Sequence, residues 1–329
     1  MKRIRLLILT GFKTLEGFQM PMENRTLLWG LDQANIEWHL HNPWKKLPNL
    51  SRFDAALVTV YWRHNVNFTY HCKKFEKACR EMGFPVINTI HNAEGRHSYY
   101  LKVWREQGIP CARYQRFRSF DDLTMDTYPL ILRRDGVHRG GGMYLVRNPE
   151  EAREVILKQH AEAAAADPEP RAPQPINLAL EFVETKTVDN YYCKWRAYVV
   201  GDEVIPAHFM RSRSPFVNYK DAALWAGTCA ADETFRHQGE PRPDLLLAAA
   251  RATGCDILTL DYSVKPDGTY VFWEGNRERA TAGDIRVRWL GLRDVDLEYG
   301  AAVARLVHRR VNAAAAGEPE ATLAGEEHR

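Results

Sequence analysis

Two short apolar segments joined by a Pro-Asp-Gly turn constrain the fold of this chain more than any other feature. Residues 258–264 and 270–276 are rich in β-branched and aromatic residues, and the turn residues lie between them. The first segment carries one acid, Asp261, and the second ends with Glu274 and Asn276. Because residues two apart on a strand point to the same face, Glu274 and Asn276 share a face. The sequence therefore predicts an antiparallel hairpin with polar oxygen atoms at one end.

The register of this hairpin decides whether Asp261 joins the other two polar residues. If Asp261 lies opposite Phe272, all three share a face, and a slip of one residue would place Asp261 on the other face. Oxygen ligands of this kind suit Mg²⁺, which usually shares its site with substrate phosphates. Two acids on an otherwise apolar sheet face would also repel each other without a cation. We therefore predict a metal site at Asp261, Glu274 and Asn276, the alternative being solvated or salt-bridged carboxylates.

Composition and charge are those of an ordinary globular protein. The chain has 329 residues, of which 45% are hydrophobic and 26% charged, enough for one large unit or for two to three packed subdomains. The net charge is only +3, and the tryptophans and arginines are dispersed, which argues against a nucleic-acid partner. No apolar run approaches the ~20 residues of a membrane helix. We expect no nucleic-acid and no membrane partner.

The cysteines and histidines point to no metal or disulfide framework. The six cysteines are scattered without a C-x-x-C pair, and the twelve histidines show no zinc-like spacing. The apolar run at residues 4–10 has no small-residue cleavage site after it, so we interpret it as a buried strand and not as a signal peptide. Together these features favour reduced thiols and a cytoplasmic location.

The N-terminal third of the chain alternates strand and helix patterns. The expected elements follow one another at residues 4–10, 22–34, 36–41, 53–61 and 66–82. Strands that alternate with helices favour a parallel sheet covered by helices. We predict a small parallel α/β domain over residues 1–90.

The rest of the chain has an α+β pattern. Strands are expected at 112–117, 130–133, 143–146, 178–183, 194–200 and 203–211, and helices at 96–107, from 149 onward and at 243–253. An Ala- and Pro-rich stretch near 161–175 predicts a mobile surface insertion, and the Ala-, Glu- and Gly-rich residues 312–329 predict a disordered tail. The mixed-charge run at 277–288 favours a solvated surface, with an anionic-substrate pocket as the alternative.

A glycine-rich loop connects two of the expected strands. Arg133 ends the first strand, and Gly140, Gly141 and Gly142 precede the second, with three further basic residues between them. Consecutive glycines let backbone N–H groups converge on an anion, and the basic residues suit a polyphosphate. The alternative is a hairpin tip with solvated arginines. The loop precedes a strand and not a helix, so it is not a dinucleotide-binding fingerprint.

The order of these parts resembles the ATP-grasp superfamily, and more narrowly its glutathione-synthetase and ribosomal-protein glutamate ligase branch. The resemblance covers about residues 85–290. It rests on short motifs in matching order, at residues 85–88, 108–110, 129–133, 140–143, 181–183 and 195–202 and at the hairpin acids. It implies an α/β fold, α+β overall, with the N-terminal parallel α/β domain followed by an ATP-grasp region of two α+β subdomains at residues 91–311.

The resemblance also implies roles for individual residues. Arg196 and Arg211 would orient a substrate carboxylate and steady charge on an acyl phosphate, although each could instead form a strand salt bridge. The other implied contacts are Asp261, Glu274 and Asn276 to Mg²⁺ (two ions, with Mn²⁺ as an alternative), Arg133, Gly140, Gly141 and Gly142 to phosphates, and Glu181, Phe182 and Val183 to adenine.

The activity implied by the resemblance is ATP-dependent ligation of a carboxylate to an amine. The carboxylate attacks the γ-phosphorus of ATP to give an acyl phosphate, and an amine then attacks the activated carbonyl. The substrates would be amino acids or peptides. A homodimer is common among similar proteins.

The chain departs from the family at several positions. The family usually has a lysine where Arg133 stands, another where Arg96 and His97 stand, and an aspartate in place of Lys194. Two alternatives therefore stay open. One is a degenerate ATP-grasp protein that binds nucleotide without ligation, and the other is a phosphotransferase that uses the same fold on a hydroxyl or sugar-like acceptor.

Overall fold

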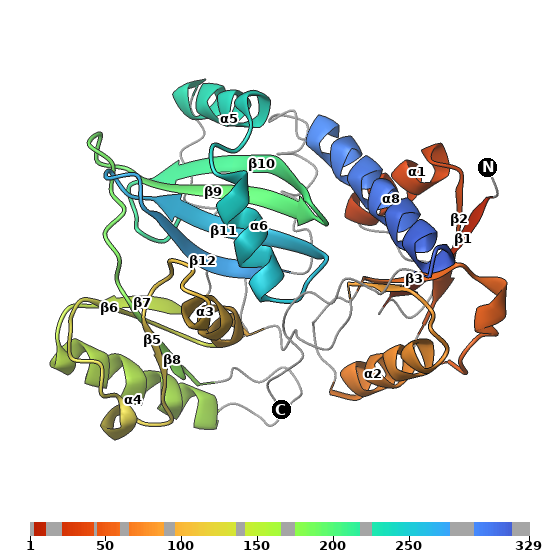
Figure 1. Ribbon diagram of the computed structural model, residues 1–329. Coiled ribbons are helices and arrows are strands. Elements are labelled where there is room, and N and C mark those ends of the chain that lie inside the picture. Colours follow the sequence, from red (N-terminus) through yellow and green to blue (C-terminus); the bar gives the residue numbers. More distant parts are fainter. Residues whose placement is uncertain are drawn as a thin grey trace.

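The computed structural model describes residues 3–10, 22–42, 45–59, 66–88, 96–135, 142–165, 175–217, 226–276 and 293–317. These residues form three four-stranded sheets with helices packed on them (Figure 1). The mixed-charge run at 277–288 lies outside the described residues, as do residues 166–174 of the Ala- and Pro-rich stretch and the last twelve residues, 318–329.

The N-terminal sheet is parallel throughout, as the alternating pattern predicts. Its strands pair in the order β2-β1-β3-β4. The elements are β1 (Ile4–Thr10), α1 (Met22–Gln33), β2 (Ile36–His41), β3 (Ala55–Thr59), α2 (Val66–Glu81) and β4 (Val86–Ile87), with a short 3-10 helix at Leu50–Arg52. The helix α2 covers one face, where Phe75 and Cys79 pack against Leu9 and Val58.

The middle sheet is antiparallel, with the strand order β5-β8-β6-β7. Its elements are α3 (His97–Glu106), β5 (Tyr114–Arg116), a 3-10 helix at Phe120–Asp122, β6 (Leu130–Arg133), β7 (Met143–Val146), α4 (Pro149–Ala165) and β8 (Leu178–Glu181). The helix α4 covers one face of this sheet. The helix α3 lies between the middle sheet and the C-terminal sheet (Figure 1). Because α4 continues to Ala165, the first five residues of the stretch near 161–175 are helical.

The C-terminal sheet is also antiparallel, with the strand order β10-β9-β11-β12. Its elements are β9 (Tyr192–Val200), β10 (Glu203–Ser212), α5 (Ala226–Gln238), α6 (Pro243–Ala252), β11 (Ile257–Val264) and β12 (Tyr270–Asn276). The predicted turn between β11 and β12 is present, and Gly268 adopts a φ of +83° there, a conformation that glycine accepts without steric cost. The helix α6 packs on one face of this sheet (Figure 1).

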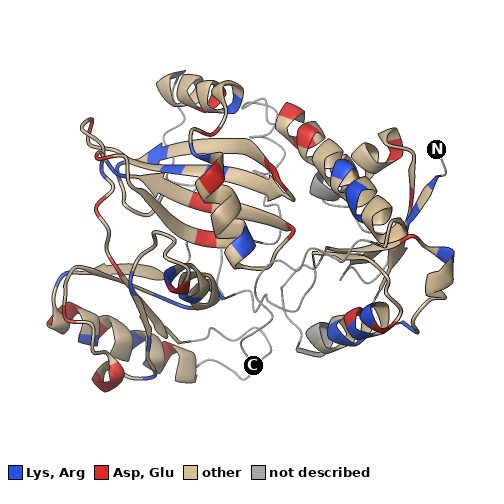
Figure 2. Ribbon diagram, in the orientation of Figure 1, with Lys and Arg blue, Asp and Glu red and all other residues tan. Residues whose placement is uncertain are grey.

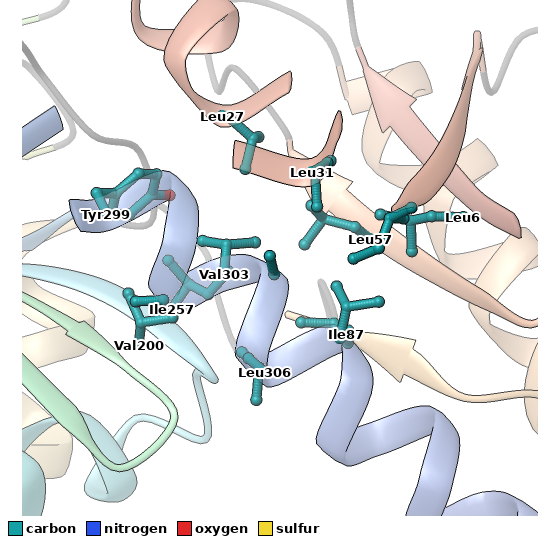
Figure 3. Packing of buried hydrophobic residues seen from close by; sticks show 14 of the residues in the cluster. Leu6, Leu27, Leu31, Leu57, Ile87, Val200, Ile257, Tyr299, Val303 and Leu306 are labelled. Carbon is teal, nitrogen blue, oxygen red and sulfur yellow. The ribbon is translucent and has the colours of Figure 1, made fainter. Parts of the chain in front are cut away.

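A long helix from the end of the chain joins the first sheet to the third. This helix, α8 (Arg293–Ala315), packs against α1 and against β9 and β10. Figure 3 shows Leu57 and Ile87 of the N-terminal sheet on one side of α8, and Val200 and Ile257 of the C-terminal sheet on the other. One apolar core therefore connects residues from both ends of the chain. The division at residue 90 stays a prediction, and α8 extends four residues into the predicted tail.

The crossing of α1 and α8 depends on two glycines that face each other. A Cβ atom added to Gly30 would lie 2.4 Å from the carbonyl carbon of Gly300, and one added to Gly300 would lie 2.5 Å from the carbonyl oxygen of Thr26. Both obstacles are backbone atoms, so no side-chain rotation can relieve them. The two helices can approach this closely only because neither residue carries a side chain.

We expect Gly30→Ala to destabilise the protein although alanine is the better helix former. Alanine in a helix gains about 1 kcal/mol over glycine, whereas overpacking typically costs about 1–3 kcal/mol and here meets backbone. The net loss should appear as a lower midpoint in urea unfolding. Trp29→Ala is the control, because Trp29 lies on the same helix with 46% of its surface exposed. A Gly30→Ala protein as stable as the wild type would show that the helices separate at little cost.

In the part of the chain that the structure describes, no helix has the length and apolar character needed to cross a membrane.

Candidate nucleotide and metal site

A row of polar and charged residues crosses the C-terminal sheet, with one residue from each strand. His208 of β10 lies opposite Arg196 of β9, Arg196 opposite Asp261 of β11, and Asp261 opposite Glu274 of β12. Residues directly opposite each other on antiparallel strands project from the same face. Figure 2 shows basic and acidic segments on neighbouring strands of this sheet. We call His208, Arg196, Asp261 and Glu274 the charged row.

The register that produces the charged row differs from the one considered from the sequence. Asp261 is not opposite Phe272. It pairs with Glu274, while Tyr262 pairs with Phe272, because β12 bulges at Trp273. The bulge lets Phe272 pack against Trp104 in the core while Glu274 stays on the face of Asp261. Asn276 lies opposite Thr259, two residues from Asp261, so the three predicted metal ligands do share a face.

Asp261 is surrounded by cations. The Nε and Nη2 atoms of Arg196 donate to its Oδ1 and Oδ2 atoms at 2.6 and 2.8 Å, and the Lys194 Nζ donates to Oδ2 at 3.0 Å. Only 2% of Asp261 is exposed. Burial would raise the pKa of this carboxyl, but Arg196 and Lys194 together hold it below its usual value. Asp261 is therefore charged at neutral pH.

These contacts correct the argument that the two acids need a metal ion. That argument assumed an otherwise apolar sheet face, whereas Lys194 and Arg196 project from the same face and neutralise Asp261. The salt bridge considered as an alternative role for Arg196 is present. A metal ion at this position stays a prediction, and repulsion between the two acids no longer supports it.

Glu274 connects the C-terminal sheet to the middle sheet. Its Oε2 atom lies 3.2 Å from the Nε2 atom of His97, the first residue of α3, and only 1% of His97 is exposed. Arg133, at the end of β6, is 7% exposed. Burial lowers the pKa of this guanidinium, and the nearby charges of Glu274 and Asp135 oppose that effect. Glu274 of the C-terminal sheet is thus near enough to Arg133 of the middle sheet for its charge to act on that guanidinium.

The end of β6 is fixed by contacts to α3. The backbone N–H of Ser98 donates to Asp135 Oδ1 at 3.1 Å, and the Ser98 hydroxyl donates to Asp135 Oδ2. The backbone N–H of Asp135 donates to Asn177 Oδ1 at 2.7 Å. These bonds hold the chain just before the glycine loop. Gly142 has a φ of +69°, a conformation that favours glycine. Gly140 and Gly141 lie outside the described residues, so the predicted phosphate contacts stay predictions.

The predicted adenine hinge follows the end of β8. The N–H groups of Glu181 and Phe182 donate to the carbonyl oxygens of Arg113 and Pro129, at 2.8 and 3.2 Å. The Glu181 carboxylate accepts from Arg113 Nε at 3.1 Å, so that side chain is engaged at the surface. Among the described residues no acceptor is seen for the Val183 N–H. The predicted contact of Val183 with adenine stays a prediction.

Arg211 is not part of the charged row. Arg211 of β10 pairs with Cys193 of β9. Because Cys193 is three residues from Arg196 on that strand, Arg211 projects from the opposite face of the sheet. Its Nε donates to the Thr228 hydroxyl at 2.9 Å, and its guanidinium lies 5.1 Å from the ring centroid of Tyr191. The structure thus separates the two arginines that were predicted to act together, and the role of Arg211 stays a prediction.

Comparison with known proteins places this arrangement in a known fold. No protein-family model and no curated protein matches the sequence. Among solved structures, a RimK domain ATP-grasp protein from Sphaerobacter thermophilus has a TM-score of 0.54 at 17% identity, covering 92% of this chain and 99% of its own. The chain has the ATP-grasp fold.

Two further ATP-grasp structures are similar over nearly their whole length. The ligase PsnB, in complex with a minimal precursor, Mg and ADP, has a TM-score of 0.55 at 13% identity and covers 93% of this chain and 98% of its own. The macrocyclase MdnC from Microcystis aeruginosa, bound to the precursor peptide MdnA, has a TM-score of 0.53 at 11% identity and covers 93% and 100%. At these identities the likeness establishes the ATP-grasp fold and not the reaction.

The sequence did not reveal which residues contact the two acids of this candidate site. Lys194 and His97 stood out only as departures from the family, and the structure places both beside predicted metal ligands. In the described ranges no three His, Cys, Asp or Glu side chains form a group that could hold a metal ion. The predicted set has two acids and one amide, so it would depend on Asn276 and on oxygen atoms from a bound nucleotide.

Proposed function

We propose that this chain is an ATP-dependent ligase that joins a carboxylate to an amine through an acyl phosphate. The observation that carries the proposal is the pair Asp261 and Glu274, which lie side by side on the C-terminal sheet, with the charge of Glu274 acting on Arg133 of the middle sheet. Acidic oxygen atoms can hold a metal ion, and a guanidinium beside the glycine loop can hold phosphate oxygens. A polyphosphate site needs both kinds of group.

The residues present fit a magnesium ion. Asp261, Glu274 and Asn276 would hold it through carboxylate and amide oxygens, the donors that Mg²⁺ prefers. The Oδ1 atom of Asp261 accepts one hydrogen bond and Oδ2 accepts two, which leaves a lone pair on Oδ1. A bound ion would neutralise charge on the phosphate oxygens. The PsnB complex with Mg and ADP supports the pairing of magnesium with a nucleotide.

In the proposed reaction the chain itself forms no covalent bond. An oxygen of the substrate carboxylate bonds to the γ-phosphorus as the bond to ADP breaks. The amine nitrogen then bonds to the acyl carbon as phosphate leaves and the amine loses a proton. Arg133 would bind phosphate oxygens, and Val183 would bind the adenine. Arg196 would keep Asp261 ionised and in place, so the protein contributes position and charge.

Peptides are the proposed substrates. Two of the similar structures are bound to precursor peptides, which supports a peptide carboxylate or amine here. The alternative, an ATP-grasp protein that binds nucleotide without ligation, is favoured by one observation: both oxygens of Asp261 already accept hydrogen bonds from cations.

We expect ATP or ADP to stabilise the protein against heat only when Mg²⁺ is present. A ligand at 100 times its dissociation constant adds about 2.7 kcal/mol to the free energy of unfolding. Thermal unfolding with and without Mg²⁺ measures this effect, and Glu274→Gln should reduce it. A shift that is the same without Mg²⁺ would contradict the metal site, and no shift with any nucleotide would contradict the proposed function.

A further inference from the structure

Lys194 turns its charge into the site and not toward solvent. Its Nζ lies 3.0 Å from Asp261 Oδ2, and 18% of its side chain is exposed, against 3% for Asp261. An ammonium is normally well hydrated, so a lysine that is held this deep has exchanged water for a carboxylate. Lys194 and Arg196 stand two residues apart on β9 and reach the same acid.

Positive groups outnumber negative ones around Asp261. Two positive groups contact this one carboxylate, and the charge of Arg133 acts near the neighbouring Glu274. A second divalent ion, bound at the Oδ2 atom of Asp261, would be one more cation within a few ångströms of the ammonium. Repulsion between like charges at that distance is strong in a poorly solvated site.

Glu274 offers the more accessible oxygens. Its side chain is 18% exposed, whereas that of Asp261 is 3% exposed beneath its two cations. Asn276, two residues further on β12, projects from the same face. One ion can therefore be held by Glu274 and Asn276 with the remaining lone pair of Asp261 Oδ1. The space beside Oδ2 is taken by Lys194.

We infer that the Lys194 ammonium takes the place of one divalent ion, so that the nucleotide-loaded site holds one metal ion and not two. The inference deepens the proposed function and rests on it. Lys194 is then a built-in monovalent cation that contacts Asp261. It lowers the metal requirement of the site and makes the first ion bind mainly through Glu274.

The test counts metal ions directly. The wild type and Lys194→Met are each saturated with a nonhydrolysable ATP analogue and titrated with Mn²⁺, and free Mn²⁺ is followed by electron paramagnetic resonance. We expect one tightly bound Mn²⁺ per nucleotide in the wild type. Lys194→Met keeps a side chain of similar length without the charge, and should bind a second Mn²⁺ at least tenfold more tightly than the wild type. Lys194→Arg keeps the charge and should bind one.

Each result decides the inference. Two tightly bound ions in the wild type, or an unchanged count in folded Lys194→Met, would overturn it while leaving the nucleotide site intact. Nucleotide binding without any Mn²⁺ would overturn it as well. Failure of every variant to bind the nucleotide would overturn the proposed function along with it. If Lys194→Met does not fold, the counts for the wild type and Lys194→Arg decide.

Discussion

Replacing Asp261 with asparagine is expected to lower the free energy of unfolding by about 3–5 kcal/mol, the range found when one partner of a buried ion pair is removed. The reason is that Arg196, 6% exposed, would lose the charge of its carboxylate partner and one of the two oxygen atoms that accept its hydrogen bonds, while it keeps its own buried charge. Lys194 would lose its partner as well. Most of the expected cost is thus the uncompensated buried cations, and only a part is the lost bonds themselves.

Urea unfolding of Asp261→Asn measures this cost, and an exposed ion pair supplies the matched control. Asp202 pairs with Arg251 at 2.9 Å, but their side chains are 75% and 54% exposed. Asp202→Asn should therefore change stability by about 0–1 kcal/mol. Adding Arg196→Met to Asp261→Asn should recover part of the loss, because the buried guanidinium of Arg196 is then removed as well. Equal effects of Asp261→Asn and Asp202→Asn would show that the buried pair contributes no special stability.

The pH dependence of the same variant has a defined sign. The folded-state pKa of Asp261 lies below the ordinary value of 3.8, so its contribution is complete well above pH 3.8 and is lost as the pH falls through the lower, folded-state pKa. The wild type should therefore lose stability in acid more steeply than Asp261→Asn does.

The strands could be predicted because their signals are local. The runs at β1, β6, β7 and the β11–β12 hairpin are apolar or β-branched and are bounded by turn residues, so their limits agree with the expected ones to within a residue. The helices α5 and α8 were not predicted. The helix α8 begins with a mixed-charge segment, and its buried residues, such as Val303, contact strands nearly the whole chain length away. The apolar face of α8 becomes buried only when the helix packs against the N-terminal sheet.

The acids of the site could be found from the sequence, but their partners could not. Asp261 and Glu274 stand out on apolar strands, whereas the pairing of Asp261 with Arg196 joins residues 65 positions apart through a strand register that no local pattern fixes. The bulge at Trp273 shows the same limit, since it reverses which residue of β12 faces the core. The contact between His97 and Glu274 depends on how α3 and the C-terminal sheet are placed relative to each other.

Glu274→Gln should lower ATP turnover by about 10²–10³-fold, the usual effect of removing one electrostatic contact to a transition state. Turnover is measured as ADP release with candidate peptides and with hydroxylamine as the amine. An acyl phosphate would be trapped as a hydroxamate, which a ligase forms and a phosphotransferase does not. Glu274 is a better choice than Asp261 for this purpose, because it is partly exposed and glutamine keeps its shape, so the fold should survive.

The control and the opposing results follow from the same assay. Glu106→Gln on α3 changes a carboxylate that is 51% exposed and pairs only with Lys102 among the ion pairs of the described residues, so its turnover should match the wild type. ADP release without hydroxamate would favour the phosphotransferase. Nucleotide binding without turnover in the wild type would favour the non-ligating protein, in which the cations on Asp261 hold the fold together and no reaction follows. Hydroxamate formation that persists in Glu274→Gln would show that the charged row is structural and that the reaction takes place elsewhere.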